Sequence, residues 1–147
     1  MTVGTLSVTI EEPDFYIFSL AQGYNEEDHK AWYEKQDYDT TYKLIAPNVF
    51  FRKITRELNA INPVRFLGLF EVHYYDEQNG MDYLDPKTYF PAFSLKDYDG
   101  FSSQKEIRAV WQPIKNDPIF PLNLNVSGLS NYIEFNNSIT KHLTNKN

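Results

Sequence analysis

The stretch PNVFFRKITRELNAINP, residues 47–63, decides the fold because it is the clearest helix in the chain. Pro47 suits the first turn of a helix, and Asn62-Pro63 ends it. Apolar residues recur at the spacing of one helical face, and charged residues fill the opposite face. The sequence therefore predicts a principal helix with a buried stripe made of Val49, Phe50, Ile54, Leu58 and Ile61.

Strand-like segments lie on both sides of this helix. Two short helices are also expected, one over residues 25–35 with Asn25 as its cap and one after Asn137. The strands do not alternate regularly with helices, which predicts the α+β class with a mainly antiparallel or mixed sheet of about five to seven strands, one principal helix and two short ones. The expected strands are residues 5–10, 15–20, 40–45, 65–75 with a bulge at Gly68, 106–111 and 122–126.

Length and composition indicate one domain of intracellular type. The chain has 147 residues, enough for one domain with its own core, so residues 1–147 are expected to form a single domain. It contains no Cys, which excludes disulfides, thiolate zinc sites and a Cys nucleophile. The N-terminus resembles no secretory signal, and no apolar run approaches the roughly 18 residues that a membrane-spanning helix needs. We therefore expect a cytoplasmic protein without a membrane segment.

Charge and aromatic content favour a protein partner over nucleic acid. The formal net charge is −6, from 20 acidic and 14 basic residues, whereas binding to a phosphate backbone needs a basic surface. The chain also contains 11 Tyr and 2 Trp, residue types that often anchor protein interfaces. We therefore expect a protein partner with a basic surface and no direct nucleic-acid ligand, and the oligomeric state stays open.

A short polar motif lies where the strand expected over residues 106–111 begins. Gln104-Lys105-Glu106 resembles the catalytic loop of ADP-ribosyltransferases. The resemblance implies that Glu106 is a catalytic acid that stabilises an oxocarbenium-like transition state, with Gln104 on the acceptor side and NAD as cofactor. Ser19 matches the hydroxyl of the family's strand motif beside the nicotinamide pocket. The family also places an Arg or His on its first strand, whereas residues 6–10 contain neither.

A second resemblance covers more of the chain, from about residue 15 to residue 112. Over this range the sequence is similar to a family of uncharacterised bacterial proteins, which end in a Lys, an aromatic residue, Gln-x-Glu or Glu-x-Glu, and an Arg. The residues that match this ending are Lys96, Phe101, Gln104, Glu106 and Arg108.

A structural role for the same motif is the alternative. Glu106 and Arg108 can form an ion pair on an exposed sheet face, which contributes under about 1 kcal/mol. In that case Glu106 pairs with a basic neighbour, either Arg108 or Arg65 across the sheet. In the enzyme, by contrast, removal of Glu106 is expected to abolish turnover and leave the fold intact, because an exposed loop carboxylate contributes little stability.

No metal site is predicted. Asp97-Tyr98-Asp99-Gly100 and Glu106 match positions of a calcium-binding EF-hand loop, but Leu95 stands where the first ligand is required and cannot coordinate. The three His residues lie on different elements without the spacing of a metal site: His29, His73 and His142.

Two functions of different classes follow. In the first, a small acidic protein, such as an inhibitor or immunity protein of phage or mobile-element type, occupies the surface of a partner and needs no cofactor. In the second, an ADP-ribosyltransferase-like enzyme of the kind used in bacterial conflict, active or degenerate, uses Glu106, Gln104 and Ser19 with NAD. The missing Arg or His in residues 6–10 favours the first hypothesis, and whether the protein is an enzyme stays open on the sequence alone.

Overall fold

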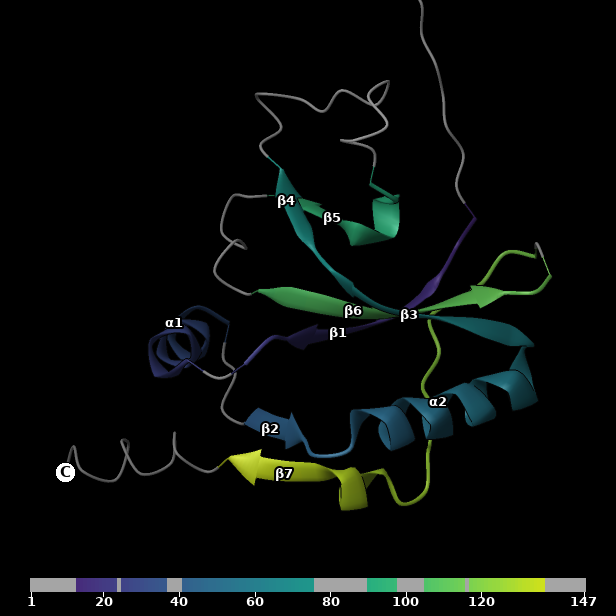
Figure 1. The fold of residues 1–147 in the computed structure, drawn as a ribbon. Helices are drawn as coiled ribbons and strands as arrows, with labels where there is room; N and C mark the ends of the chain where they lie inside the picture. The colour runs from purple at the N-terminus through teal and green to yellow at the C-terminus, as the bar shows by residue number, and fades with distance from the viewer. Residues whose placement is uncertain are drawn as a thin grey trace, which may run out of the picture.

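The computed structural model describes residues 13–23, 25–36, 41–75, 90–97, 105–115 and 117–136, and Figure 1 shows their arrangement. The principal helix, α2 (Pro47–Ile61), forms where the sequence predicts it. Pro47 stands in its first turn, where a missing amide hydrogen removes no helical bond. The chain leaves the helix at Asn62 in an extended conformation. The helix buries Phe50, Phe51, Ile54 and Leu58.

Helix α2 packs against one face of a three-stranded antiparallel sheet (Figure 1). The strands are β1 (Tyr16–Ala21), β6 (Glu106–Pro113) and β3 (Val64–Glu71), in the order β1-β6-β3. The register of β3 on β6 shifts between Phe66 and Gly68, and Gly68 has a φ of +131°, which favours glycine. The bulge predicted at Gly68 is therefore confirmed.

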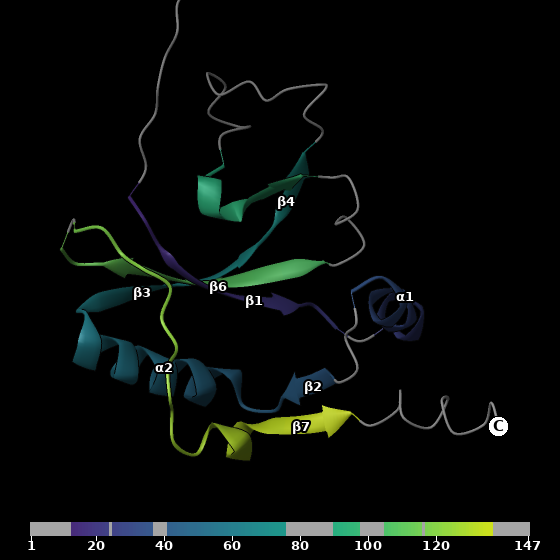
Figure 2. The ribbon, with the colours of Figure 1, turned by 180° about the vertical axis from the view of Figure 1, so that it is seen from behind.

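Two smaller ladders flank this sheet on opposite faces (Figures 1 and 2). On the side of α2, β2 (Thr41–Leu44) pairs antiparallel with β7 (Ile133–Asn136). On the other side, β4 (His73–Tyr75) pairs in parallel with β5 (Leu95–Asp97). The central sheet is thus covered on both faces.

Three short helical elements complete the described fold. Helix α1 (Glu26–Gln36) begins after Asn25, whose Oδ1 accepts a hydrogen bond from the amide of Glu27 at 2.9 Å. The cap predicted at Asn25 is therefore confirmed. The 3₁₀ turn η1 (Ala92–Ser94) leads into β5, and η3 (Leu129–Tyr132) leads into β7.

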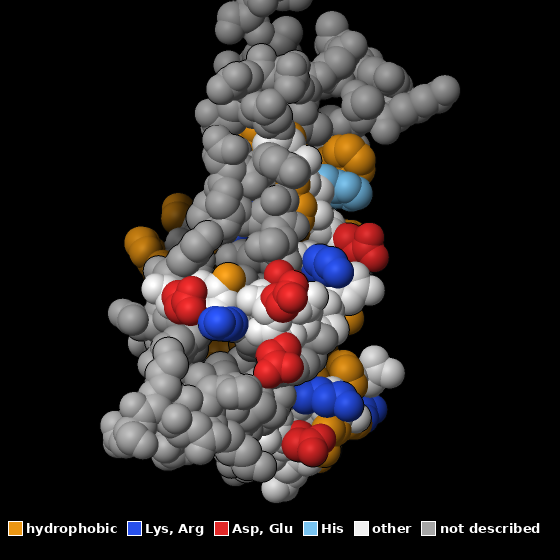
Figure 3. Space-filling view, turned by 90° about the vertical axis from the view of Figure 1, so that its left-hand side faces the viewer, with side chains coloured by type: hydrophobic (Ala, Val, Ile, Leu, Met, Phe, Trp, Pro, Cys, Tyr) orange, Lys and Arg blue, Asp and Glu red, His pale blue; other side chains and the backbone are white. Residues whose placement is uncertain are grey.

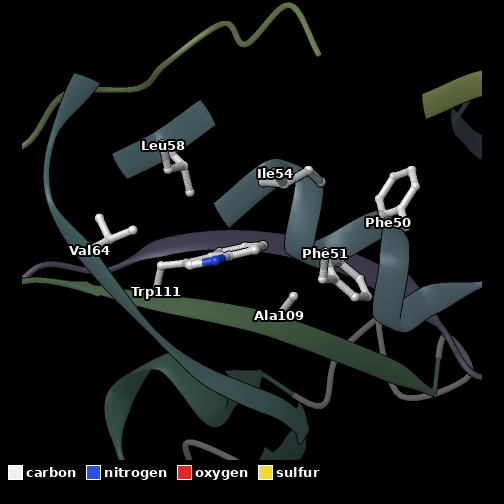
Figure 4. Close-up of a cluster of buried hydrophobic side chains, with 7 residues drawn as sticks. All are labelled: Phe50, Phe51, Ile54, Leu58, Val64, Ala109 and Trp111. Carbon is white, nitrogen blue, oxygen red and sulfur yellow. The ribbon is translucent and has the colours of Figure 1, made fainter. Parts of the chain in front are cut away.

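The hydrophobic core lies between α2 and the central sheet (Figure 4). Trp111 is only 1% exposed, and its indole Nε1 donates a hydrogen bond to Thr55 Oγ1 of α2 at 2.7 Å. Because side chains alternate along a strand, Trp111 and Ala109 of β6 face α2, whereas Glu106 and Arg108 face β4 and β5. The buried cluster comprises Phe50, Phe51, Ile54, Leu58, Val64, Ala109 and Trp111.

The predicted fold class is confirmed: the protein is α+β, with mainly antiparallel pairing and one principal helix. Among the described residues seven strands form three separate ladders, where a single sheet was expected. Residues 65–75 do not form one strand, because the strand is interrupted at Val72 and β4 pairs in a different ladder from β3. The strand predicted over residues 5–10 and the helix predicted after Asn137 lie outside the described residues.

The strand predicted over residues 122–126 is wrong. These residues form no strand, and β7 lies further along the chain at Ile133–Asn136. The alternation has another cause: Leu124 and Val126 pack against the core cluster, while Asn125 between them is exposed. Packing of a single extended segment therefore produces the same period of two as a strand.

The buried stripe of α2 also differs in part from the prediction. Ile61 is 59% exposed and Val49 is half-buried, whereas Phe51, which lies outside the predicted stripe, is buried. Phe51 lies beside Phe66 and Trp111, because the helix packs on a sheet that is wider than one helical ridge.

Candidate functional site

Glu106, the first residue of β6, lies at the centre of a buried ionic cluster. Only 7% of the residue is exposed, and both of its carboxylate oxygens accept hydrogen bonds. Ser19 Oγ and Arg108 Nε donate to Oε1 at 2.8 and 2.7 Å, and Lys96 Nζ donates to Oε2 at 2.6 Å. Side chains from β1, β5 and β6 thus hold this carboxylate.

Arg108 and the backbone of Glu106 extend the cluster to the layer above the sheet. Arg108 Nη1 donates to the carbonyl oxygens of Phe93 and Leu95 at 2.7 and 3.2 Å. The amide of Glu106 donates to the hydroxyl of Tyr74 at 3.1 Å. Polar bonds therefore attach η1, β4 and β5 to the central strand.

The neighbours of Glu106 keep its carboxyl group charged. Burial by itself raises the pKa of Glu106, but hydrogen bonds from Lys96, Arg108 and Ser19, together with the charge of Arg108, outweigh burial and hold the pKa below its ordinary value of 4.5. Near neutral pH the group is therefore a carboxylate that accepts hydrogen bonds and has no proton to donate.

The structure brings together two of the three candidate catalytic residues. Ser19 and Glu106 are 87 positions apart in sequence and share a hydrogen bond, because β1 and β6 are neighbouring strands. Gln104 lies outside the described residues. The expectation that Glu106 is an exposed carboxylate is wrong, since it begins β6 and is buried under the β4–β5 layer.

The predicted ion pair between Glu106 and Arg108 is confirmed. The other predicted partner, Arg65, instead donates to Gln112 Oε1 at 2.7 Å. Lys96 and Tyr74 also contact Glu106, and the sequence predicts neither contact. Neither contact leaves a sequence signal, because both residues reach Glu106 from a layer that folds over the sheet.

A separate apolar cleft of about 710 Å³ opens between β1, α2 and the segment 119–126. Ile17, Phe120 and Leu122 line it and are 44%, 75% and 38% exposed. Among the described residues that line the cleft, Asp14 alone carries a charge, and Glu106 is not one of them. The cleft and the ionic cluster are therefore two different places in the molecule.

The edge of β1 that faces away from β6 also presents backbone polar groups. The amide of Gln22 donates to the carbonyl of Lys105 at 2.9 Å, which continues the β1–β6 ladder. Because alternate residues of an antiparallel strand bond to the partner, Gln22 and every second residue before it face β6. Ile17, Ser19 and Ala21 therefore direct their N–H and C=O groups to the outer edge.

In the part of the chain that the structure describes, no three His, Cys, Asp or Glu side chains gather as metal ligands would. Of the calcium pattern considered above, Tyr98, Asp99 and Gly100 lie outside the described residues. No helix within the described ranges has both the length and the apolar character needed to cross a membrane.

Comparison with known proteins gives no relative. No family model matches the chain, and no curated protein or solved structure matches it. The resemblances based on Gln104, Glu106 and Ser19 therefore stay predictions.

Proposed function

We propose that this chain is a small acidic protein that acts in the cytoplasm by binding another protein and occupying its surface, as inhibitors and immunity proteins of phage or mobile-element type do. The observation that carries the proposal is the apolar cleft beside β1, where Ile17, Phe120 and Leu122 are exposed. The absence of Cys from the sequence suits a reducing compartment.

Exposed apolar side chains around a cleft favour binding over chemistry. Burial of one such side chain against a partner contributes about 1.5–3 kcal/mol. Phe120, at 75%, is the most exposed of the large hydrophobic residues in the described part of the chain. A catalytic pocket, in contrast, needs several convergent polar groups, and Asp14 is the one charged residue described in the cleft wall.

The described charges do not form an acidic binding face on the side of the molecule shown in Figure 3. On the side of the molecule that Figure 3 presents, acidic and basic side chains are interspersed, so the net charge of −6 is not gathered there as one acidic patch. An apolar contact at the cleft therefore gives a better basis for binding than an acidic face does.

The test begins with affinity purification from the native host, with the full chain as bait, and continues with calorimetric titration of the isolated partner. Phe120→Ser in the cleft is compared with Phe135→Ser, a 60% exposed residue of β7 that does not line the cleft. We expect Phe120→Ser to weaken binding at least about tenfold, which corresponds to about 1.4 kcal/mol. Equal affinities of the two variants would show that the cleft is not the binding surface.

An ADP-ribosyltransferase-like enzyme is the second candidate. The observation that favours it is the hydrogen bond of 2.8 Å between Ser19 and Glu106, the two described residues that the family resemblance singles out. It ranks second because three donors already occupy the carboxylate of Glu106, and because Glu106 does not line the cleft.

Calorimetric titration with NAD separates the enzyme from the binding protein. The binding function predicts no heat of binding and no transfer of label from NAD to any acceptor. The enzyme predicts both, and it predicts that Glu106→Gln abolishes transfer. Because Glu106→Gln also alters the ionic cluster, circular dichroism of the variant must show that it is folded.

A further inference from the structure

We propose that the cleft takes one extended segment of the partner protein, which adds as a strand to the outer edge of β1 and places alternate apolar side chains into the cleft. This inference rests on the proposed binding function and specifies how the partner is held. In complexes of this kind backbone hydrogen bonds give affinity, and pockets for alternate side chains give specificity.

The outer edge of β1 is open to such pairing. Ile17, Ser19 and Ala21 direct their backbone groups away from β6, and no described strand pairs with them. The sequence of β1, YIFSLA, contains no charged residue and no Pro. Charged side chains and Pro are the features by which edge strands ordinarily prevent pairing with another chain, and β1 lacks both.

The opposite edge of the same sheet is protected. There β3 carries Arg65 and Glu71 at exposed positions, together with the bulge at Gly68. Charges and bulges both hinder the addition of a further strand. The two edges therefore differ in the way expected if one of them receives a partner.

The cleft lies along the unprotected edge. Tyr16 and Phe18 of β1 line it, and Ile54 and Leu58 of α2 form the opposite wall. Side chains of an added strand alternate between the two faces of the sheet, so every second one would point toward α2 and into the cleft. A volume of about 710 Å³ is within the range of roughly 300–1,000 Å³ that encloses whole small ligands, so it has room for more than one side chain.

Charge indicates a basic residue at one end of the partner segment. Asp14 lines the cleft at the N-terminal end of β1 and is the one charged residue described there. A Lys or Arg of the partner would be attracted by this acid. The expected occupant is therefore a segment of alternating apolar residues with Lys or Arg at one end.

The probe is a phage-displayed library of linear twelve-residue peptides, selected on the immobilised full chain. We expect enriched peptides that alternate apolar and polar residues and contain Lys or Arg. Ile17→Pro removes an outward amide without removing a bond of the β1–β6 ladder, and should weaken a selected peptide at least about tenfold. Leu69→Pro is the control, because Leu69 is an outward residue of β3, 48% exposed against 44% for Ile17, and does not line the cleft.

A second variant keeps the test valid if Ile17→Pro fails to fold. Ile17→Lys places on β1 the kind of charge that protects natural edges, and it should weaken the peptide in the same way. If peptides bind the Ile17 variants as they bind the wild type but lose affinity for Phe120→Ser, strand addition is wrong and the proposed binding function stands. If no variant changes peptide affinity, the strand addition and the proposed binding function are both wrong.

Two other occupants give distinct results that would overturn the inference. A dimer that dissociates in Ile17→Lys, measured by analytical ultracentrifugation, would identify a second copy of this chain. A loss of melting temperature in Val8→Pro as large as that in Ile17→Pro would identify residues 5–10 of the chain itself, because Pro prevents strand pairing by that segment.

Discussion

The side chain of Glu106 is buried at a cost that its three donors offset. Taking a carboxylate out of water costs several kcal/mol, and the cost is recovered only where partners satisfy its oxygens. Ser19, Lys96 and Arg108 supply those bonds within 2.8 Å. The cluster therefore depends above all on Glu106, because it supplies the carboxylate that Lys96 and Arg108 share.

The first prediction concerns the charge of Glu106. Glu106→Gln retains the shape of the side chain but removes the buried carboxylate that Arg108 and Lys96 share, so we expect a loss of about 3 kcal/mol in the free energy of unfolding. Urea denaturation measures this loss. Glu71→Gln, on an exposed position of β3, is the control and should change stability by less than about 0.5 kcal/mol. A similar small loss for both variants would mean that the ionic cluster contributes little to the free energy of unfolding.

The second prediction concerns pH. The pKa of Glu106 is lower in the folded protein than its ordinary value of 4.5, so the unfolded chain takes up this proton first as pH falls. The stability that Glu106 contributes is therefore fully present above about pH 4.5 and is lost as pH falls through the lower folded-state pKa. Urea denaturation of the wild type and of Glu106→Gln between pH 7 and pH 3 should show a constant difference that shrinks below pH 4.5. A difference independent of pH would contradict the assignment.

At the scale of elements, α2 and β6 form most of the core. Strand β6 is buried on both faces, because Ala109 and Trp111 face α2 while Val110 and Glu106 face the β4–β5 layer. The alternation of apolar and polar residues that predicts an exposed sheet face therefore misleads here. A polar side chain in a strand that is covered on both faces must be hydrogen-bonded, as that of Glu106 is.

The third prediction tests the buried face of α2. Ile54→Ala should cost about 2–5 kcal/mol, because Ile54 is 6% exposed and lies in the core cluster. Ile61→Ala, on the same helix but 59% exposed, should cost under about 0.5 kcal/mol. Thermal or urea denaturation of the two variants measures the contrast. Equal losses would mean that the helix is rotated from the orientation described.

At the scale of the whole molecule, the two layers beside the central sheet have different anchors. The layer of α2 is held by the aromatic and aliphatic core, with the bond from Trp111 to Thr55. The layer of β4, β5 and η1 is held by polar bonds to Glu106 and Arg108 and by the contacts of the Phe93 ring with Phe15 and Phe70. Elements with separate anchors are expected to open separately.

The fourth prediction follows from these anchors. In hydrogen exchange, Glu106→Gln should raise the exchange rates of η1 and β5, Ala92–Asp97, more strongly than those of α2. Thr55→Val removes the hydrogen bond to Trp111 on the other face of the sheet. This variant should raise the exchange rates of α2 more strongly than those of η1 and β5. If both variants raise exchange uniformly, the molecule opens as one unit and the layers are not independent.

Local patterns in the sequence determined α2, the strands β1, β2, β3 and β6, and the α+β class. Helical and strand periods act over a few residues, so they could be recognised without knowledge of the rest of the chain. The same patterns failed at residues 122–126, where packing of a single segment produced the alternation of a strand.

The candidate site was decided by the tertiary structure. The sequence indicated Glu106, Arg108 and Ser19, but it could not show that Glu106 is buried, nor that Lys96 and Tyr74 reach it. These contacts depend on which strands become neighbours and on which face a second layer covers. The cleft beside β1 has the same origin, since residues 14–18, α2 and the segment 119–126 meet only when the chain has folded.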